Sequence, residues 1–300
     1  MSNINKKEQN ATNNPFYSLN AKIKADQIFN DFEKRVKANE VKNDGTDELL
    51  NIIDKYVLSS KENPFFKTLN KGTKLYRARI VDIDSISTSK GFNLKIPFLS
   101  GFNESESREP PLGISKPGRN NIEGVSFLYL ANNPETACCE VKPSIRQIIS
   151  LAEFELVATK HIVDFSKDVK LEGEDEEFSI GRLFTEIMGI YSFPISNDSQ
   201  YRTSQILTDY IRKTGIDGIA YRSYFSEKGI NYTLFNSDHR SVRYLGSRLL
   251  LLQSERRTFL DFDNERIITA ESVGGATYDK ESSQKMARDI MATISMKAKE

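Results

Sequence analysis

The spacing of apolar side chains along the chain changes from helical to strand-like near residue 70. From Ala21 to Ala38 the apolar positions recur at helical spacing, and a second helix is expected from about Thr46, with acidic residues in its first turn. Pro64 ends this helix, because the residue before a proline disfavours helical backbone. We interpret the two helices as a small N-terminal module or as a flank on the main domain.

Beyond residue 70, short runs of β-forming residues alternate with helical segments. Strands are expected in KLYRARIVDI, SFLYLA, GIDGIAYRS, GINYTLFN and RLLLLQS, and one or two more in IISLAEFELVATKHIVDFS. Helices are expected to start at Asn133-Pro134-Glu135 and to span Glu174 to Tyr191 and Tyr201 to Lys213. A long loop rich in Gly and Pro runs from Gly91 to Gly124, and loops of this kind in compact domains often carry function.

The order of these elements predicts an α+β protein with a sheet core and flanking helices. We expect a disordered N-terminus at residues 1–20 and a helical N-terminal module at 21–70. The main domain is placed at residues 71–246, and a C-terminal extension, partly disordered, at 247–300. The sequence shows no internal repeat.

Composition excludes several classes of protein. Lys plus Arg and Asp plus Glu number 42 each, and the resulting zero net charge argues against a protein that binds duplex DNA by electrostatics. No apolar run is long enough to span a bilayer, and the N-terminus lacks the apolar core of a secretion signal. We therefore expect a cytoplasmic protein with neither a membrane nor a nucleic acid as partner.

The few cysteines and histidines do not suggest a metal site. Cys138 and Cys139 are adjacent, which disfavours a disulfide, and we expect them to be small buried side chains on a helix. His161 and His239 lie far from them in sequence, so we predict no bound metal. Phosphate-loop, dinucleotide-fold, metalloprotease and serine-hydrolase motifs are also missing from the sequence.

Four clusters carry residue types that are suited to chemistry. In the first, LYRAR, Arg77 and Arg79 share one face of a strand, where they form either a solvated edge or a bidentate phosphate site. In the second, PPLGISKPGRNN, the loop around Arg119 offers backbone N–H groups and a cation, which together favour an anion.

The third cluster, LYLANNPETACCEV, contains Tyr129 and Glu140. Tyr129 lies on an apolar strand, where a core role is the ordinary interpretation. Glu140 lies among apolar neighbours, a setting in which a carboxylate is expected to be partnered or functional. An exposed helix position, or an ion pair with Lys142 or Arg146, explains Glu140 equally well.

The fourth cluster follows at the start of a helix and in the two strands after it. Thr203, Ser204 and Gln205 come first, and a helix N-cap would account for Thr203 or Ser204 without any active site. Ser223 and Asn231 follow on the strands.

Taken in this order, the clusters resemble the RES domain family, named for its Arg, Glu and Ser residues. The resemblance covers about Leu75 to Phe235 and rests on GFNESESREPPLGISKPGRNNIEGVSFLYLANNPETACCEVKP and YRTSQILTDYIRKTGIDGIAYRSYFSEKGINYTLF, with LYRAR before them. The chain departs from the family pattern at Asn121 and Tyr224, which bear on the shape of the pocket rim.

The resemblance implies an ADP-ribosyltransferase-like fold at residues 71–246 and an enzyme that consumes NAD as substrate, without a cofactor. Members of the family are typically toxins of toxin–antitoxin pairs that deplete NAD by phosphorolysis or hydrolysis. NAD, inorganic phosphate and an antitoxin protein are thus the expected partners.

Carried over by motif position, the family residues fall on five residues of the clusters. Arg77 is the family arginine, Glu140 the glutamate and Ser223 the serine, while Arg119 and Tyr129 match further pocket positions.

In the expected reaction Glu140 stabilises positive charge on the ribose as nicotinamide leaves. Arg77 and Arg119 bind the pyrophosphate, while Tyr129 and Ser223 contact the nicotinamide ribose or its base. Gln205 and Asn231 are weaker candidates for NAD binding.

Two other functions fit the same residues. A mono-ADP-ribosyltransferase would use this pocket and move the ADP-ribose onto a macromolecule. A non-enzymatic module could bind a nucleotide in the same cleft, although Arg77, Glu140 and Ser223 argue against it.

Overall fold

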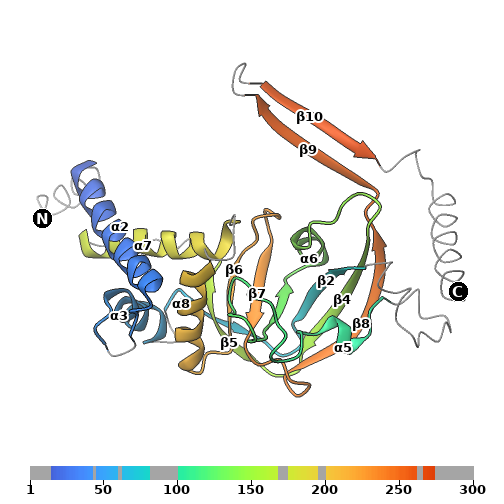
Figure 1. Cartoon of the computed structure of the whole chain (residues 1–300), viewed down its shortest axis with the longest axis horizontal. Helices are drawn as coiled ribbons and strands as arrows, with labels where there is room; N and C mark the ends of the chain where they lie inside the picture. Colours follow the sequence, from blue (N-terminus) through green and yellow to red (C-terminus); the bar gives the residue numbers. More distant parts are fainter. Residues whose placement is uncertain are drawn as a thin grey trace, which may run out of the picture. The chain divides into compact units, whose positions relative to one another are not determined.

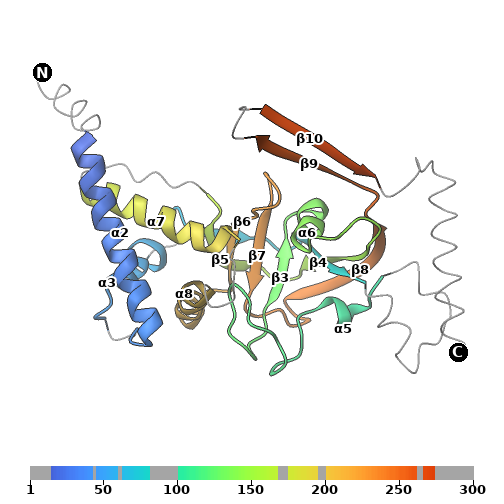
Figure 2. The ribbon, with the colours of Figure 1, turned by 45° about the horizontal axis from the view of Figure 1, so that its top comes forward.

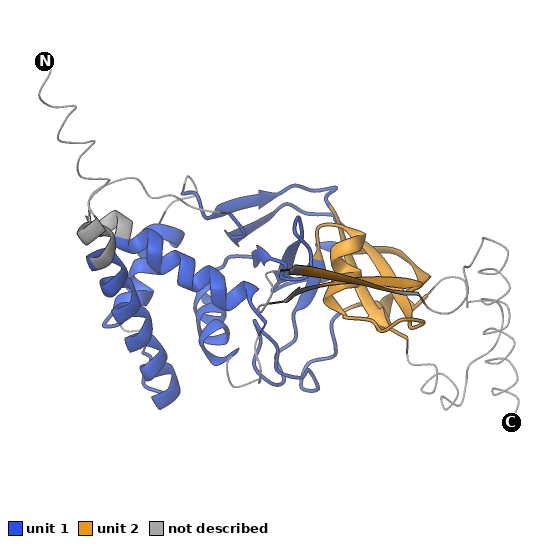
Figure 3. Cartoon of the chain, turned by 90° about the horizontal axis from the view of Figure 1, so that it is seen from above, with its two compact units in different colours: residues 1–73, 109–130, 156–242 blue, residues 74–108, 131–155, 243–300 orange. Residues whose placement is uncertain are grey.

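The fold is known from a computed structural model that describes residues 15–42, 45–59, 63–81, 101–167, 175–194, 201–261 and 266–273. These residues form two compact units, which Figure 3 colours separately. The first unit comprises residues 1–73, 109–130 and 156–242, and the second comprises 74–108, 131–155 and 243–300. Residues 1–14 of the N-terminus predicted to be disordered lie outside the described residues.

The first unit begins with helices that pack together. They are α2 (Pro15–Ala38), α3 (Glu48–Ile53) and the π-helix η1 (Asp54–Leu58). Asp47 is the N-cap of α3, because its carboxylate accepts a hydrogen bond from the Leu50 backbone N–H at 3.1 Å. The Asn63 amide donates to the Val57 carbonyl at 2.8 Å and so satisfies a carbonyl at the end of η1. Both predicted N-terminal helices are thus confirmed.

The strands of the first unit are arranged in the order β1-β5-β6-β7-β3. Their bounds are β1 (Phe66–Leu69), β3 (Leu128–Ala131), β5 (Lys160–Phe165), β6 (Gly218–Arg222) and β7 (Ile230–Leu234). β1 and β7 pair antiparallel with β5 and β6, whereas β5 and β6 run parallel. A parallel pair needs a long crossover, and α7 (Asp175–Ser192) and α8 (Arg202–Lys213) lie in this connection.

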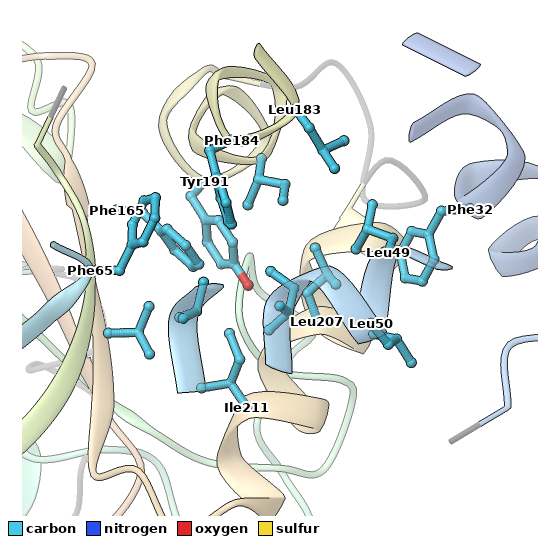
Figure 4. Packing of buried hydrophobic residues seen from close by; sticks show 14 of the residues in the cluster. Phe32, Leu49, Leu50, Phe65, Phe165, Leu183, Phe184, Tyr191, Leu207 and Ile211 are labelled. Carbon is cyan, nitrogen blue, oxygen red and sulfur yellow. The ribbon is translucent and has the colours of Figure 1, made fainter. Parts of the chain in front are cut away.

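The core of the first unit lies between its helices and its sheet. Figure 4 shows Tyr191 of α7 surrounded by side chains from α8, from β5 and from the N-terminal helices, which share this single core. The Tyr191 ring stacks on Phe165 at a centroid distance of 5.2 Å, and Phe65 packs on Phe184 at 4.3 Å. Figures 1 and 2 show α2 lying across α7, so the N-terminal helices contribute directly to this core.

The second unit contains β2 (Lys74–Ile80), β4 (Ile148–Leu156) and β8 (Val242–Leu251), in the order β2-β4-β8. β2 pairs antiparallel with β4 and, through Tyr76, with Ala131 at the end of β3. The short helices α5 (Glu104–Ser107) and α6 (Pro134–Glu140) belong to this unit, and α6 packs on β2. β9 (Ser254–Asp261) and β10 (Arg266–Val273) form an antiparallel hairpin that the sequence analysis did not predict.

The structure confirms the α+β class, with a largely antiparallel sheet, flanking helices and a helical segment at the N-terminus. The predicted boundaries at residues 20, 70 and 246 stay predictions, and residues 274–300 of the predicted extension lie outside the described residues. Within the described ranges, no helix combines the length and the apolar character that crossing a membrane would require.

Candidate functional site

Side chains from α8 hold the loop at residues 118–121 in the first unit. The Gln205 amide nitrogen donates to the carbonyls of Gly118 and Asn121, at 2.8 and 3.0 Å, and the Ser204 hydroxyl donates to the Arg119 carbonyl at 2.6 Å. The start of α8 therefore fixes the backbone of this loop. Ser204 and Gln205 do so from inside the helix, because the N-cap is Tyr201, and the interpretation of Thr203 or Ser204 as the cap is wrong.

Tyr129 holds the same loop from β3. Its hydroxyl donates to Asn121 Oδ1 at 2.6 Å and accepts from the Asn120 backbone N–H at 3.1 Å. A Cβ atom on Gly118 would lie 2.7 Å from Asn121 Oδ1 and 3.2 Å from the Tyr129 hydroxyl, so a side chain at this position would have to displace the Asn121 amide. Burial, followed by the nearby Tyr221, raises the pKa of Tyr129, so its phenol stays protonated at physiological pH.

Arg119 points its guanidinium at the end of α7. Its Nη1 and Nη2 atoms donate to the carbonyls of Ile190 and Phe193, at 2.5 and 2.8 Å, and its Cζ lies 5.3 Å from the centroid of the Tyr201 ring. The last carbonyls of a helix lack hydrogen-bond donors within the helix and form the negative end of its dipole. A guanidinium supplies both the missing donors and a positive charge. The remaining N–H groups of Arg119 make no hydrogen bond to any residue that the structure describes.

Backbone N–H groups of this loop are less available to an anion than the sequence suggested. The Gly118 N–H donates to the Asn121 carbonyl at 2.9 Å, and the Asn120 N–H donates to Tyr129. Asn120 also donates through its side chain to the Thr233 hydroxyl on β7. The loop thus uses these groups to hold its own shape, and the side chain of Arg119 is its main cationic group.

Ser223 and Asn231 lie on the hairpin of β6 and β7. Ser223 is 9% exposed, its backbone N–H donates to the Gly229 carbonyl at 2.9 Å, and its hydroxyl accepts from the Phe225 N–H at 3.1 Å. Asn231 is directly opposite Tyr221 and therefore shares its sheet face. The first unit thus holds Arg119, Tyr129, Gln205, Ser223 and Asn231 of the predicted site.

In the second unit, β2 carries Arg77 and Arg79, and both contact α5. Arg77 Nη1 donates to the Ser107 carbonyl at 3.4 Å, and Arg79 Nη1 donates to the Glu106 carbonyl. Arg79 also lies 5.1 Å from the centroid of the Phe102 ring. Arg77 is half-buried and Arg79 is exposed, so the two side chains differ in their access to solvent although they share a strand face.

Glu140 is the last residue of α6. Asn133 caps this helix by accepting from the Thr136 N–H at 2.7 Å, and Pro134 follows it, so the predicted helix start is confirmed. Glu140 is half-buried, which places its carboxylate between a core position and open solvent.

The two cysteines precede Glu140 on α6, and both are free thiols. Cys138 is half-buried and packs on a cluster that includes Ala78, whereas Cys139 is exposed, so the prediction that both are buried side chains is wrong. The helix turns only one of two consecutive residues toward β2. Burial raises the pKa of both thiols, which leaves them in the protonated form.

The first unit also contains a buried ion pair, which the sequence analysis did not predict. Asp164 on β5 is 0% exposed and lies 3.3 Å from the Lys67 ammonium, which donates to the Tyr232 hydroxyl at 3.2 Å. In the sequence, the ion pair is indicated by Asp164, an acidic residue inside the apolar run HIVDF. Among the described residues, no three His, Cys, Asp or Glu side chains are grouped closely enough to hold a metal ion.

Comparisons with known proteins point to one family. A model of the RES domain matches residues 102–254, about half of the chain. Glu140 and Ser223 lie inside the matched range, and Arg77 lies before it. No curated protein matches the sequence.

One of the solved structures that match the chain resembles it only weakly. It is a chain of the M. tuberculosis MbcT–MbcA toxin–antitoxin complex, at 12% identity and a TM-score of 0.34, with 81% of this chain and 97% of that chain covered. The match to the family model, which spans β3, α6 and the strands β4 to β8, shows that this chain belongs to the RES domain family.

Proposed function

We propose that this protein consumes NAD by cleaving the bond between nicotinamide and ribose, through phosphorolysis or hydrolysis, and that it acts as a toxin in the cytoplasm. The observation that carries the proposal is the presence of Glu140 and Ser223, at the family positions of the motif series, within the range matched by the RES model. An antitoxin protein is the partner that this function implies.

The chemistry assigned to Glu140 follows from the charge that develops in the reaction. As nicotinamide leaves, the ribose becomes positively charged, as in the hydrolysis of glycosides. A carboxylate held near that charge and partly removed from water stabilises the transition state more than the ground state. Glu140 is half-buried at the end of a capped helix, which suits this role.

Arginines are assigned to the two phosphates of NAD. The guanidinium of Arg119 uses part of its hydrogen-bonding capacity on the end of α7, and its remaining N–H groups, which make no hydrogen bond to a described residue, are assigned to a phosphate oxygen. Arg77 supplies the second guanidinium from β2.

Tyr129, Ser223 and the amides complete the assignment. Because the Tyr129 phenol stays protonated and its hydroxyl is used by the loop, we assign its ring face, rather than a proton transfer, to the substrate. Ser223 binds the nicotinamide ribose through its buried hydroxyl. Gln205 positions the loop that carries Arg119, and Asn231 offers an amide on the same sheet face as Tyr221.

Product analysis of the purified full chain tests the reaction. The protein is incubated with NAD carrying a label in the ADP-ribose part, with and without inorganic phosphate. Free ADP-ribose indicates hydrolysis, and its phosphate ester indicates phosphorolysis. Label that stays attached to protein would instead identify a mono-ADP-ribosyltransferase, and intact NAD would refute the proposed activity.

Substitution of the proposed catalytic carboxylate tests the mechanism. Glu140→Gln keeps the side-chain shape and should lower kcat by roughly 10²–10³, the scale of removing one preorganised stabilising group. Glu135→Gln is the matched control, because Glu135 is exposed on the same helix. Unchanged NAD consumption by the Glu140 variant would remove this residue from the mechanism.

Arg77→Ala should raise the KM for NAD, and a normal KM would argue against the assignment of Arg77 to a phosphate of NAD.

A further inference from the structure

Tyr201 occupies the N-cap position of α8 without capping the helix, because its side chain makes no hydrogen bond to the first turn. Serine, threonine, aspartate and asparagine are preferred at this position, since their side chains accept from N–H groups that have no partner within the helix. The chain thus gives up a helix cap here. Departures of this kind from a local preference are expected mainly at functional sites.

The ring of Tyr201 lies against the guanidinium of Arg119. The Cζ atom of Arg119 is 5.3 Å from the centroid of the ring, which is within the range of a cation–π contact. Tyr201 is half-buried, and its hydroxyl makes no hydrogen bond to any residue that the structure describes. The aromatic ring is therefore the part of this side chain that acts on Arg119.

The backbones of the two residues are also tied together. The Ser204 hydroxyl lies 2.6 Å from the Arg119 carbonyl oxygen and 3.0 Å from the Tyr201 carbonyl oxygen, so one donor bridges both. The start of α8 therefore holds the Tyr201 ring next to Arg119 through the backbone as well as through the contact between the side chains.

The ring holds the guanidinium in a different way from the end of α7. The carbonyls of Ile190 and Phe193 each accept a hydrogen bond from Arg119 and so occupy N–H groups that a ligand could use. A ring attracts a cation through its negative face and occupies no N–H group. Tyr201 thus adds to the fixation of Arg119 while leaving its remaining donors for a phosphate.

We propose that Tyr201 is a positioning residue, whose ring keeps the Arg119 guanidinium in the orientation that binds a phosphate of NAD. This inference rests on the proposed function, since it takes the phosphate role of Arg119 from it. The ring acts through Arg119 and not on the reacting atoms. Because a phosphate contact far from the reacting bond stabilises the substrate and the transition state alike, loss of the ring should change KM and not kcat.

Kinetics of the purified full chain with NAD test this role. Tyr201→Leu removes the ring and keeps an apolar side chain, and it should raise the KM for NAD about threefold to tenfold, with kcat within about twofold of the wild type. Tyr201→Phe keeps the ring and should restore wild-type kinetics. A normal KM in the folded leucine variant, or an equal rise in KM in the phenylalanine variant, would refute the role of the ring.

A double-mutant cycle separates positioning from a general effect on the fold. In the Arg119→Ala background, Tyr201→Leu should cause no further rise in KM, because the group that the ring positions is absent. An equal rise in both backgrounds would mean that Tyr201 acts independently of Arg119 and would overturn the inference. Thermal melts establish that each variant is folded, and Tyr201→Met or Arg119→Met replaces a variant that is not.

Binding of ADP-ribose separates failure of this inference from failure of the proposed function. ADP-ribose keeps both phosphates of NAD and lacks nicotinamide, and calorimetry measures its affinity without turnover. We expect Tyr201→Leu to bind it about threefold to tenfold more weakly than the wild type. If the wild type consumes NAD and both proteins bind ADP-ribose equally well, only the role of Tyr201 is refuted. A wild type that neither consumes NAD nor binds ADP-ribose would refute the proposed function and this inference with it.

Discussion

Removing the hydroxyl of Tyr129 tests how the loop at residues 118–121 is held. In Tyr129→Phe, the ring stays in place, but Asn121 Oδ1 loses its donor and the Asn120 N–H loses its acceptor. Both residues are buried, at 4% and 1% exposure, so water cannot readily replace the hydroxyl. Leaving buried polar groups unsatisfied costs about 1–3 kcal/mol, and we expect the free energy of unfolding to fall by about that amount.

The assay for this prediction is thermal unfolding of the full chain by calorimetry. A loss of about 2 kcal/mol corresponds to a decrease in Tm of roughly 4–8 °C for a protein of this size class. Tyr56→Phe is the matched control, because Tyr56 packs against Phe184 and its hydroxyl has no hydrogen-bond partner among the described residues. If both variants melt within about 1 °C of the wild type, the hydroxyl of Tyr129 does not hold the loop.

Other substitutions test the remaining polar contacts. Arg119→Ala removes the donors at the end of α7 and should lower the free energy of unfolding by about 1–3 kcal/mol. Arg119→Lys should recover only part of this loss, because an ammonium lacks the planar fork of a guanidinium. Thermal unfolding measures both variants, and an unchanged Tm would contradict the capping role of Arg119. Asp47→Ala removes the N-cap of α3 and the 3.2 Å ion pair with Arg35, so we expect the free energy of unfolding measured in urea to fall by about 1–2 kcal/mol. Asp47→Asn should lose less, because asparagine can still cap the helix. Lys67→Met leaves the buried Asp164 without its cation and should cost about 3–5 kcal/mol near neutral pH. Burial lowers the pKa of the Lys67 ammonium, but Tyr232 and Asp164 outweigh this effect and raise the pKa above 10.5. The difference in unfolding free energy between the variant and the wild type should therefore be full below pH 10.5 and should shrink as the pH rises through the folded-state pKa. A difference in stability that does not depend on pH would contradict the ion pair.

Local patterns in the sequence were sufficient for most of the secondary structure. Apolar spacing located α2, α7 and α8, and the Asn-Pro-Glu sequence located the start of α6. These features depend on side chains within one or two turns of each other, and such contacts form wherever the segment is placed. The hairpin of β9 and β10 was missed, because its strands mix charged and apolar residues without a clear alternation.

The candidate residues were found from the sequence, but their hydrogen-bond partners were not. Arg119 meets a carbonyl 71 positions away, and Gln205 meets one 87 positions away. Tyr129 was expected in the core or against the substrate, and its hydroxyl instead holds a loop.

The sequence by itself determined which residue types are present, the local elements that carry them and, through the order of its motifs, the family. The tertiary structure decided which polar groups of the chain meet. The physical reason is one of range: helix caps and strand patterns arise between near neighbours, whereas the contacts of Arg119, Gln205 and the Lys67–Asp164 pair exist only after distant segments have packed into a common core.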